Sequence, residues 1–94
     1  MVVWNFRHKG LERFFIDGDP KGLPAAAIDK LRRMLTFLAN MASANELHSI
    51  PAWKTHPLKG NRKGTWSLFV TRNWRLTFRI DRDEICDINL EDYH

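Results

Sequence analysis

Two neighbouring segments near the C-terminal end place an apolar side chain at every second position, and a short polar turn separates them. The segments are residues 66–70 and 74–80, with Arg72 in the turn. A period of two puts these apolar side chains on one face of an extended strand, and so short a connection makes the two strands pair antiparallel. A third alternating segment, residues 86–91, follows after a few polar residues. The sequence therefore predicts an antiparallel sheet with one apolar face.

The preceding half of the chain predicts one more strand and two helices. Residues 2–6 have the β-branched and aromatic composition of a strand, and a short helix is expected from Leu11 until Gly18 ends it. A longer helix of about five turns begins at Pro24, which suits a first helical position. Apolar residues recur along it at steps of three and four, as a core-facing stripe requires: Ala27, Leu31, Met34, Leu38 and Met41. A capping box at residues 43–46 predicts one further helical turn.

Length and composition limit the classes of protein that are possible. The chain has 94 residues, of which 44% are hydrophobic and 28% charged, so one domain spanning residues 1–94 is expected. A large internal cofactor cavity would compete with so small a core, and no cofactor is expected. No apolar run has the length of a signal peptide or a membrane span, which predicts a cytoplasmic protein without a membrane partner. Cys86 is the sole cysteine, and its apolar neighbours predict a buried structural thiol.

Positive charge is concentrated in the third quarter of the chain. The formal net charge is +4, but residues 54–82 hold eight basic residues and one acidic residue, whereas residues 83–94 hold five acidic residues and no Lys or Arg. The basic set suits contact with a polyanion: Lys54, Lys59, Arg62, Lys63, Arg72, Arg75, Arg79 and Arg82. Several of these cations lie in a predicted loop, residues 51–64, together with His56. The four histidines lack the spacing of metal ligands, so no metal site is expected.

Strand parity assigns further polar side chains to one exposed face. Arg75 and Arg79 alternate with the apolar residues of their strand, so both are expected to be exposed cations. Tyr93 falls in the same alternating positions as the polar residues of the last strand, so it is expected on their face, and it is followed directly by His94. Asp92 supplies a carboxylate that could orient the His94 imidazole. From composition alone, the basic loop is also explained as a solvated loop and the chain end as a frayed end.

Three motifs occur in order along the second half: LKGNRKGTWS at residues 58–67, NWRLTF at 73–78 and DYH at 92–94. Together with HKGL at residues 8–11 and LPA at 23–25, they resemble the HigB toxins, or plasmid-maintenance killer family, of the RelE/ParE superfamily. The resemblance covers nearly the whole chain. It implies a RelE-like α+β fold in which two helices pack on an antiparallel-rich sheet, in the order β-α-α-β-β-β.

The resemblance also implies an activity and partners. Such toxins are typically ribosome-dependent endoribonucleases without a cofactor, and they cut mRNA in the decoding site of the 70S ribosome. They are neutralised by a HigA-type antitoxin that contains a helix-turn-helix. The toxin alone is expected to be a monomer and to form a hetero-oligomer with its antitoxin.

Carried over residue by residue, the family's catalytic positions fall on five residues, with Asp92 as a supporting acid: His56, Lys59, Arg75, Tyr93 and His94. Contacts with RNA and the ribosome are expected from the remaining cations: Lys54, Arg62, Lys63, Arg72 and Arg79. The sequence departs from the family at Asn61, where an acid is common, and at residues 51–55, which match poorly. These departures concern codon preference and ribosome fit rather than the chemistry.

The side chains themselves suit metal-free RNA cleavage. In that reaction the 2′-hydroxyl attacks the adjacent phosphate, which requires a base, cations for the added negative charge and an acid for the departing 5′-oxygen. The hypothesis is that His94 or His56 takes the 2′ proton or acts as the acid. Tyr93 then orients the substrate or shares proton transfer, while Arg75 and Lys59 stabilise the phosphorane. Imidazole titrates near 6.5 when unperturbed, so either histidine suits either role.

Two other functions stay open at this stage. A toxin similar to the ParE branch of the superfamily would inhibit DNA gyrase by binding and would do no RNA chemistry. A non-catalytic RNA-binding or ribosome-binding module would need only the arginine face with Trp53 or Trp66 as stacking contacts. The set of two histidines, a phenol and paired cations favours the endoribonuclease.

Overall fold

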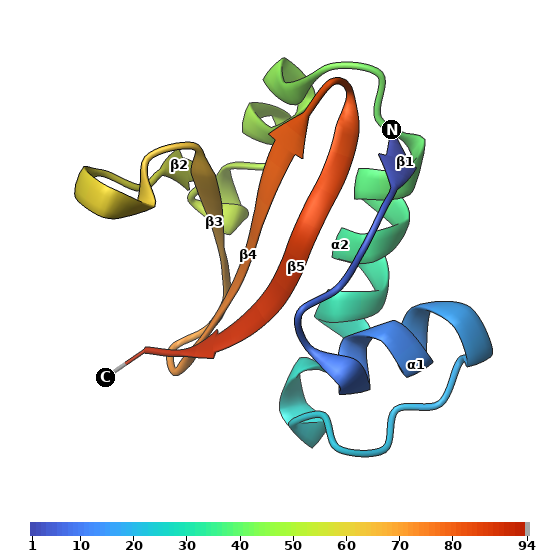
Figure 1. Ribbon diagram of the computed structural model, residues 1–94. Coiled ribbons are helices and arrows are strands. Elements are labelled where there is room, and N and C mark those ends of the chain that lie inside the picture. Colours follow the sequence, from blue (N-terminus) through green and yellow to red (C-terminus); the bar gives the residue numbers. More distant parts are fainter. Residues whose placement is uncertain (94) are drawn as a thin grey trace.

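The computed structural model describes residues 1–93, in which two helices cover one face of a five-stranded sheet (Figure 1). The helices are α1 (Lys9–Asp17) and α2 (Ile28–Asn40). The strands are β1 (Val2–Val3), β2 (His56–Pro57), β3 (Thr65–Thr71), β4 (Trp74–Asp81) and β5 (Glu84–Asp92). Within these residues, no helix combines the length and the apolar character that crossing a bilayer requires. The predicted α+β class and the predicted order of helices and long strands are confirmed.

The long strands pair as the alternating pattern predicts. In the spatial order β1-β5-β4-β3-β2, strand β4 is antiparallel to both β3 and β5, and Leu76 lies opposite Leu68 on one side and Leu90 on the other. All three leucines are buried. Strand β1 adds to β5 in the parallel sense, so the N-terminal strand lies at one edge of the sheet beside the C-terminal strand. The predicted antiparallel-rich sheet with one apolar face is confirmed.

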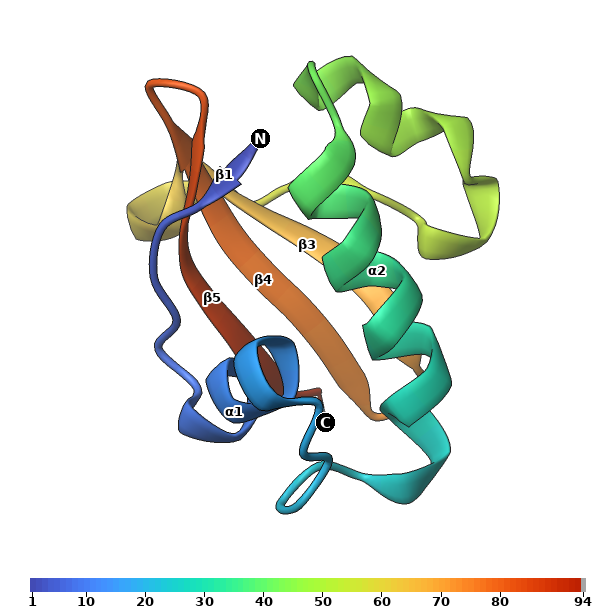
Figure 2. The same cartoon turned by 90° about the vertical axis from the view of Figure 1, so that its right-hand side faces the viewer.

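Helix α2 closes the apolar face of the sheet (Figure 2). Each member of the predicted stripe is buried, with Ala27 just ahead of the helix and Met41 just after it: Ala27, Leu31, Met34, Leu38 and Met41. Helix α1 begins after His8, whose Nδ1 accepts a hydrogen bond from the Leu11 backbone N–H. It ends at Gly18, whose φ of 72° is a left-handed conformation that few residues other than glycine adopt. Helix α1 therefore ends at the residue that the sequence indicates.

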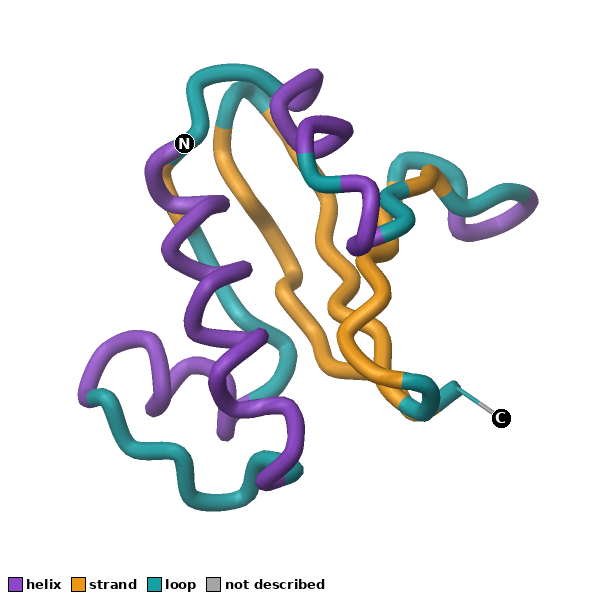
Figure 3. The backbone as a smooth tube through the Cα atoms, turned by 180° about the vertical axis from the view of Figure 1, so that it is seen from behind, coloured by secondary structure: helices purple, strands orange, loops and turns teal. Residues whose placement is uncertain are grey.

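The segment between α2 and β3 has more structure than a loop. Ser43 and Glu46 form the predicted capping box, and the turn that they start is a 3₁₀ helix, Ala44–Ser49. The two-residue strand β2 then pairs with β3, and a short 3₁₀ turn, Gly60–Arg62, lies between them. A strand of two residues has no periodicity that a sequence can reveal, so the prediction of a plain loop over residues 51–64 is wrong at β2. Seen from behind, this hairpin projects from the side of the sheet away from the helices (Figure 3).

A β-bulge in β5 changes which face Cys86 occupies. The pairing of β4 with β5 shifts between Thr77 and Arg79, and Asp87 at this point has a φ of 54°. Because of the shift, Cys86 lies opposite Arg79 in the pairing of the two strands. Simple alternation along β5 would instead place Cys86 on the same face as the core residue Ile88. The thiol is buried as predicted, with 7% of the residue exposed, but it is not part of the main apolar cluster.

Candidate functional site

A groove on the face of the sheet away from α2 brings together residues from three strands and from the chain that precedes β3. Its volume is about 280 Å³, which is at the lower limit of the roughly 300 to 1,000 Å³ typical of enclosed small-molecule pockets. Its lining residues are Lys54, His56, Leu58, Arg62, Ser67, Phe69, Arg75, Thr77, Glu91, Asp92 and Tyr93. The groove therefore suits a short stretch of an extended, charged ligand more than a buried cofactor.

Cations and aromatic rings alternate along the groove. The Lys54 Nζ atom lies 4.9 Å from the centroid of the Phe69 ring, and the Arg75 guanidinium carbon lies 4.5 Å from the same centroid. The other neighbour of Arg75 is the Tyr93 ring, at 4.2 Å from guanidinium carbon to centroid. We call the set Lys54, Phe69, Arg75 and Tyr93 the cation–aromatic column. Contacts of this length are attractive and hold the two positive charges in place without neutralising them.

Arg75 is also fixed by the turn between β3 and β4. Its Nη1 atom donates hydrogen bonds to the carbonyl oxygens of Thr71 (2.8 Å), Trp74 (3.1 Å) and Arg72 (3.4 Å). The side chain is half-buried, so the prediction of an exposed, unattached cation is wrong for Arg75. Its Nε and Nη2 atoms have no hydrogen-bond partner within residues 1–93, and they retain their donors for a ligand.

His56 enters the groove from the short strand β2. Its backbone pairs with Ser67, and its Nδ1 atom lies 3.0 Å from the carbonyl oxygen of Lys54. A carbonyl oxygen only accepts, so this contact assigns the hydrogen of the neutral ring to Nδ1 and leaves a lone pair on Nε2. Lys54 itself has a φ of 46°, an uncommon conformation for a residue other than glycine. The contact with the Lys54 carbonyl thus orients the ring and, when the ring is neutral, makes Nε2 its hydrogen-bond acceptor.

The C-terminal end of β5 is tied to the same turn that holds Arg75. Asp92 pairs with Trp74 in the sheet, and the Tyr93 backbone N–H donates to the Asn73 carbonyl oxygen at 2.7 Å. Tyr93 is 61% exposed in spite of its contact with Arg75, so much of its ring is available to a ligand. The structure therefore confirms that Tyr93 and Arg75 share one face, while His94 lies outside the described residues.

The predicted catalytic residue Lys59 and four of the five predicted RNA-binding cations divide into two groups, while the fifth, Lys54, lines the groove. Lys59, Lys63 and Arg72 are exposed but do not line the groove. Arg62 and Arg79 are each paired with a carboxylate: Arg62 binds Glu91 through two hydrogen bonds, and the Arg79 Nε atom donates to Asp87 at 2.9 Å. The structure thus brings His56, Arg75, Asp92 and Tyr93 together with Lys54 and Arg62, and leaves Lys59 at the edge of the site.

Glu91 and Phe69 are groove residues that the sequence interpretation did not select. The Glu91 carboxylate accepts from Arg62 and from the Thr77 hydroxyl, and the Arg62 contact lowers the pKa of Glu91. Strand parity did place both residues on the polar face of the sheet, which is the signal that could have found them. A search for cations and proton-transfer groups overlooks an acid that is paired and a ring that is apolar.

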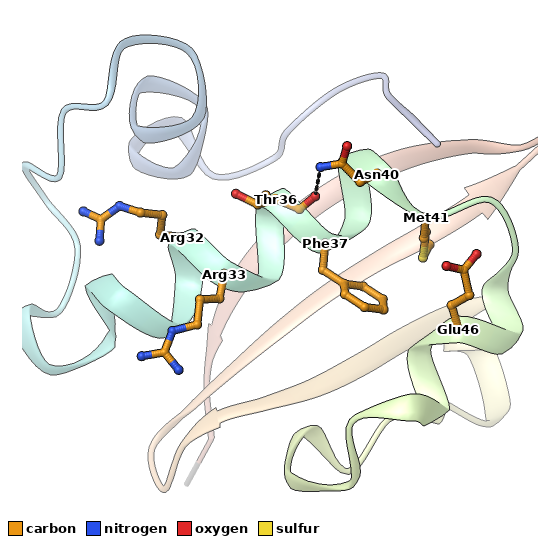
Figure 4. Close-up of a pocket in the computed structure, with 7 residues that line it drawn as sticks. All are labelled: Arg32, Arg33, Thr36, Phe37, Asn40, Met41 and Glu46. Atoms are coloured by element: carbon orange, nitrogen blue, oxygen red, sulfur yellow. Dashed lines mark hydrogen bonds between the residues drawn. The ribbon is translucent and has the colours of Figure 1, made fainter.

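A larger hollow of about 520 Å³ lies beside α2, away from these groups (Figure 4). Its lining includes the apolar side chains of Phe37 and Met41, and three of its polar side chains, those of Arg32, Asn40 and Glu46, have local partners. Glu46 accepts from two backbone N–H groups of its capping box, and Arg32 is paired with Asp29. In the part of the chain that is described, no group of three or more His, Cys, Asp and Glu side chains is placed to hold a metal ion. The groove on the other face is therefore the better candidate for chemistry.

Comparisons with known proteins identify the family of this chain and solved structures that share its fold. Residues 4–94 match the family model of HigB-like toxins, described as RelE-like toxins of the type II toxin–antitoxin system HigB. The chain is 38% identical over 93 residues to endoribonuclease HigB of Proteus vulgaris, covering 99% of this chain and 100% of that protein. Two solved structures share the fold. YafQ of Escherichia coli has a TM-score of 0.57 and 22% identity over 69% of this chain and 68% of its own. The YoeB–YefM complex of Staphylococcus aureus has a TM-score of 0.55 and 19% identity over 100% and 98%. The chain thus belongs to the HigB-like family of RelE-like toxins of type II toxin–antitoxin systems.

Proposed function

We propose that this toxin is an endoribonuclease that cuts mRNA on the translating ribosome by metal-free attack of a 2′-hydroxyl on the adjacent phosphate. The relative from Proteus vulgaris carries the name endoribonuclease and matches the chain from end to end. The observation that carries the mechanism is the convergence of an imidazole, His56, with the cation–aromatic column in one groove.

Each step of the cleavage has a group in the groove that suits it. His56 Nε2 takes the 2′ proton while the 2′-oxygen bonds to phosphorus, and Arg75 stabilises the added negative charge on the phosphorane. The bond from phosphorus to the 5′-oxygen then breaks, and an acid at the C-terminal end, Tyr93 or His94, protonates the departing oxygen. The products are a 2′,3′-cyclic phosphate and a 5′-hydroxyl. The reverse assignment, with His94 as the base and His56 as the acid, uses the same groups.

Tyr93 has a second task in this proposal. Arg75 lies against its ring, yet most of the residue is exposed. A nucleobase can therefore stack on the phenol ring and place its ribose and phosphate over Arg75. Asp92, which borders the same groove, supports the histidine that follows Tyr93.

The ribosome supplies what the groove lacks. The groove is open and short, so it gives a free RNA strand few contacts that would hold it bent for in-line attack. The exposed cations Lys59, Lys63 and Arg72 lie outside its lining, the two lysines in the β2–β3 hairpin and Arg72 in the β3–β4 turn, and they suit contacts with phosphates of mRNA or ribosomal RNA. We therefore assign the binding role mainly to Lys63 and Arg72, with Lys54 inside the groove, while Lys59 shares with Arg75 the stabilisation of the phosphorane.

The remaining parts of the proposal concern partners. As a type II toxin, the chain acts in the cytoplasm as one domain of residues 1–94 and is neutralised by a HigA-type antitoxin with a helix-turn-helix. The free toxin is a monomer, and the complex is a hetero-oligomer.

The test is primer extension on ribosome-bound mRNA with and without purified toxin, beside naked mRNA at equal concentration. The proposal expects cuts in the decoding site and largely intact naked RNA, with 2′,3′-cyclic phosphate and 5′-hydroxyl ends. Equal cutting of naked RNA would overturn ribosome dependence, and 5′-phosphate ends would overturn the 2′-hydroxyl mechanism. Intact mRNA together with inhibited DNA supercoiling would support the gyrase inhibitor, and ribosome binding without cuts the binding module.

A further inference from the structure

The hairpin tip between β2 and β3 has no core of its own. Residues 59–64 are all exposed, and the turn Gly60–Arg62 buries no side chain. Its backbone hydrogen bonds stay inside the hairpin, as in Leu58 N–H to the Thr65 carbonyl at 2.8 Å and Lys63 N–H to the Gly60 carbonyl at 3.1 Å. Hydrogen bonds of this kind close a loop but do not set its direction relative to the sheet. The tip therefore needs a contact with another element if it is to keep one position.

Arg62 provides that contact. Its Nη1 atom donates to Glu91 Oε1 at 2.9 Å, and its Nη2 atom donates to Glu91 Oε2. The two residues are 29 positions apart, so the pair joins the hairpin tip to the distant strand β5. Two parallel hydrogen bonds between guanidinium and carboxylate fix an orientation as well as a distance.

Thr77 fixes the acceptor in turn. Its hydroxyl donates to Glu91 Oε2 at 2.5 Å, and the residue is only 4% exposed in the middle of β4. The Glu91 carboxylate is thus hydrogen-bonded both to Thr77 in strand β4 and to Arg62 in the hairpin tip. Because Glu91 is fixed to the sheet, its contact with Arg62 holds the hairpin tip in one position relative to the sheet.

The negative charge of Glu91 excludes the role of general acid for this residue. Glu91 lies opposite Arg75 in the pairing of β4 with β5 and borders the groove, where an unpaired carboxylate would repel a phosphate. The hydrogen bonds from Arg62 and then Thr77 lower the pKa of Glu91, so the carboxylate stays ionised near neutral pH. An ionised carboxylate has no proton to donate and is not a general acid, and the charge of Glu91 is compensated by Arg62.

We propose that Glu91 is a positioning residue, which with Thr77 holds Arg62 and so fixes the hairpin tip that follows His56 and carries Lys59 beside the groove. In this role Arg62 tethers the hairpin and does not bind RNA. The proposal rests on the proposed ribonuclease function for its activity readout, and on the free protein for its structural readout.

The tether and an RNA-binding role for Arg62 predict opposite results for one variant. If Arg62 binds phosphate, Glu91→Ala frees a cation and removes a repulsive charge, so RNA binding becomes tighter. If Arg62 is a tether, Glu91→Ala and Arg62→Ala release the same hairpin and cause the same loss. A displacement of a reacting group by about 1 Å costs on the order of 100-fold in rate. We therefore expect each variant to lose about 10- to 100-fold in kcat on ribosome-bound mRNA, with a smaller change in KM.

The double variant Arg62→Ala with Glu91→Ala completes the experiment. The tether predicts that it is no worse than either single variant, because the second change removes nothing that remains. The matched control is Asp29→Asn, which breaks the exposed Asp29–Arg32 pair on α2 and is expected to leave kcat and KM unchanged. Additive losses, or tighter RNA binding by Glu91→Ala, would overturn the proposal.

Hydrogen exchange on the free toxin separates this proposal from the proposed function. Exchange of the Leu58 and Lys63 amides should become several-fold faster in Glu91→Ala and Arg62→Ala, while exchange of the amides in α2 changes little. Unchanged exchange at the hairpin would overturn the tether even if the protein cuts RNA. Faster exchange with no RNA cleavage by the wild-type toxin would support the tether and overturn the proposed function instead.

Discussion

The guanidinium carbon of Arg75 lies 4.2 Å from the centroid of the Tyr93 ring, and this contact joins the C-terminal end of β5 to the turn between β3 and β4. Phe69 supports Arg75 from its other side at 4.5 Å. Tyr93, which follows β5 directly, is therefore part of the groove, although exposed termini often fray. This arrangement makes the cation–aromatic column sensitive to changes at any of its members.

Arg75→Ala is expected to impair both activity and stability. It removes the donors proposed to stabilise the phosphorane, and loss of one such donor typically costs about 100- to 1,000-fold in kcat. It also removes two ring contacts and the hydrogen bonds to the β3–β4 turn, a loss of about 1 to 2 kcal/mol in the free energy of unfolding. Arg75→Lys keeps the charge without the planar fork and should be intermediate in both. Primer extension and thermal melting measure the two effects, with Arg33→Ala on α2 as the control. Full activity of Arg75→Ala would remove Arg75 from the mechanism.

Phe69→Leu tests the centre of the column. The substitution keeps an apolar side chain on β3 but removes the ring against which Lys54 and Arg75 lie. Stability should change by less than about 1.5 kcal/mol, while cleavage should fall by about tenfold, because both cations lose an attractive contact that orients them. Phe15→Leu is a matched control, since it removes a ring of α1 that lies tilted against Phe6, far from these cations in the chain. Equal cleavage by wild type and Phe69→Leu would show that the ring has no part in orienting the cations.

Lys59→Ala should reduce cleavage without reducing stability. Lys59 is exposed at the start of the hairpin turn, and no part of the described chain forms an ion pair with it. Its charge is thus available to a phosphate, and its removal should lower the cleavage rate by about tenfold or more. The melting temperature should stay within about 1 °C, in line with substitutions at exposed sites. Lys30→Ala, an exposed lysine on α2, is the control. A lower melting temperature for Lys59→Ala would assign the residue a structural role instead.

The stability of the protein should decrease in acid because of Glu91 and Asp87. Hydrogen bonds from Arg62 lower the pKa of Glu91 below its ordinary 4.5, and those from Asn5 and then Arg79 lower the pKa of Asp87 below its ordinary 3.8. Below about pH 5 the unfolded chain therefore binds protons first, so the free energy of unfolding falls as the pH falls. Both carboxylates contribute their full stabilisation at a pH above their pKa values in the unfolded chain. This stabilisation is lost once the pH falls through their lower pKa values in the folded protein.

Melting temperatures between pH 3 and pH 8 measure this effect. Glu91→Gln should have a shallower decline below pH 5 than wild type, because the variant has one fewer carboxylate whose pKa differs between the two states. Glu46→Gln tests whether any carboxylate gives the same result, since its pairing is confined to the capping box. If the melting temperatures of wild type and Glu91→Gln decline equally steeply below pH 5, Glu91 does not contribute to the acid sensitivity of the fold.

Much of the fold follows from local patterns in the sequence. The α2 stripe, the capping box at residues 43–46 and the β3–β4 hairpin are each specified by residues close together in the chain. The same alternation placed Arg75 and Tyr93 on one face, where the structure shows them in contact. These predictions succeeded because a helix or hairpin buries its apolar residues at a fixed period.

The features that the sequence interpretation missed depend on distant partners or on the exact geometry of a formed turn. The bulge at Asp87 is held by Asn5, whose side-chain amide donates to Asp87 Oδ1 at 3.0 Å across 82 positions of the chain. This bulge moves Cys86 off the face of β5 that packs into the core. The Arg62–Glu91 pair spans 29 positions, and the carbonyl partners of Arg75 exist only once the turn has formed. No local period encodes such contacts, so only the folded chain reveals them.

The most direct test of the groove as the site of cleavage is end mapping of ribosome-bound mRNA with full-length toxin, the truncated form 1–92 and His56→Ala. The truncation removes Tyr93 and His94 but no residue of the apolar core, so it should fold and still bind the ribosome. Proton-transfer groups contribute about 100- to 10,000-fold each. We expect cuts in the decoding site from the full-length toxin alone, with both variants bound to ribosomes and the mRNA intact. Undiminished cuts by the 1–92 form and by His56→Ala would place the chemistry outside this groove and contradict the account.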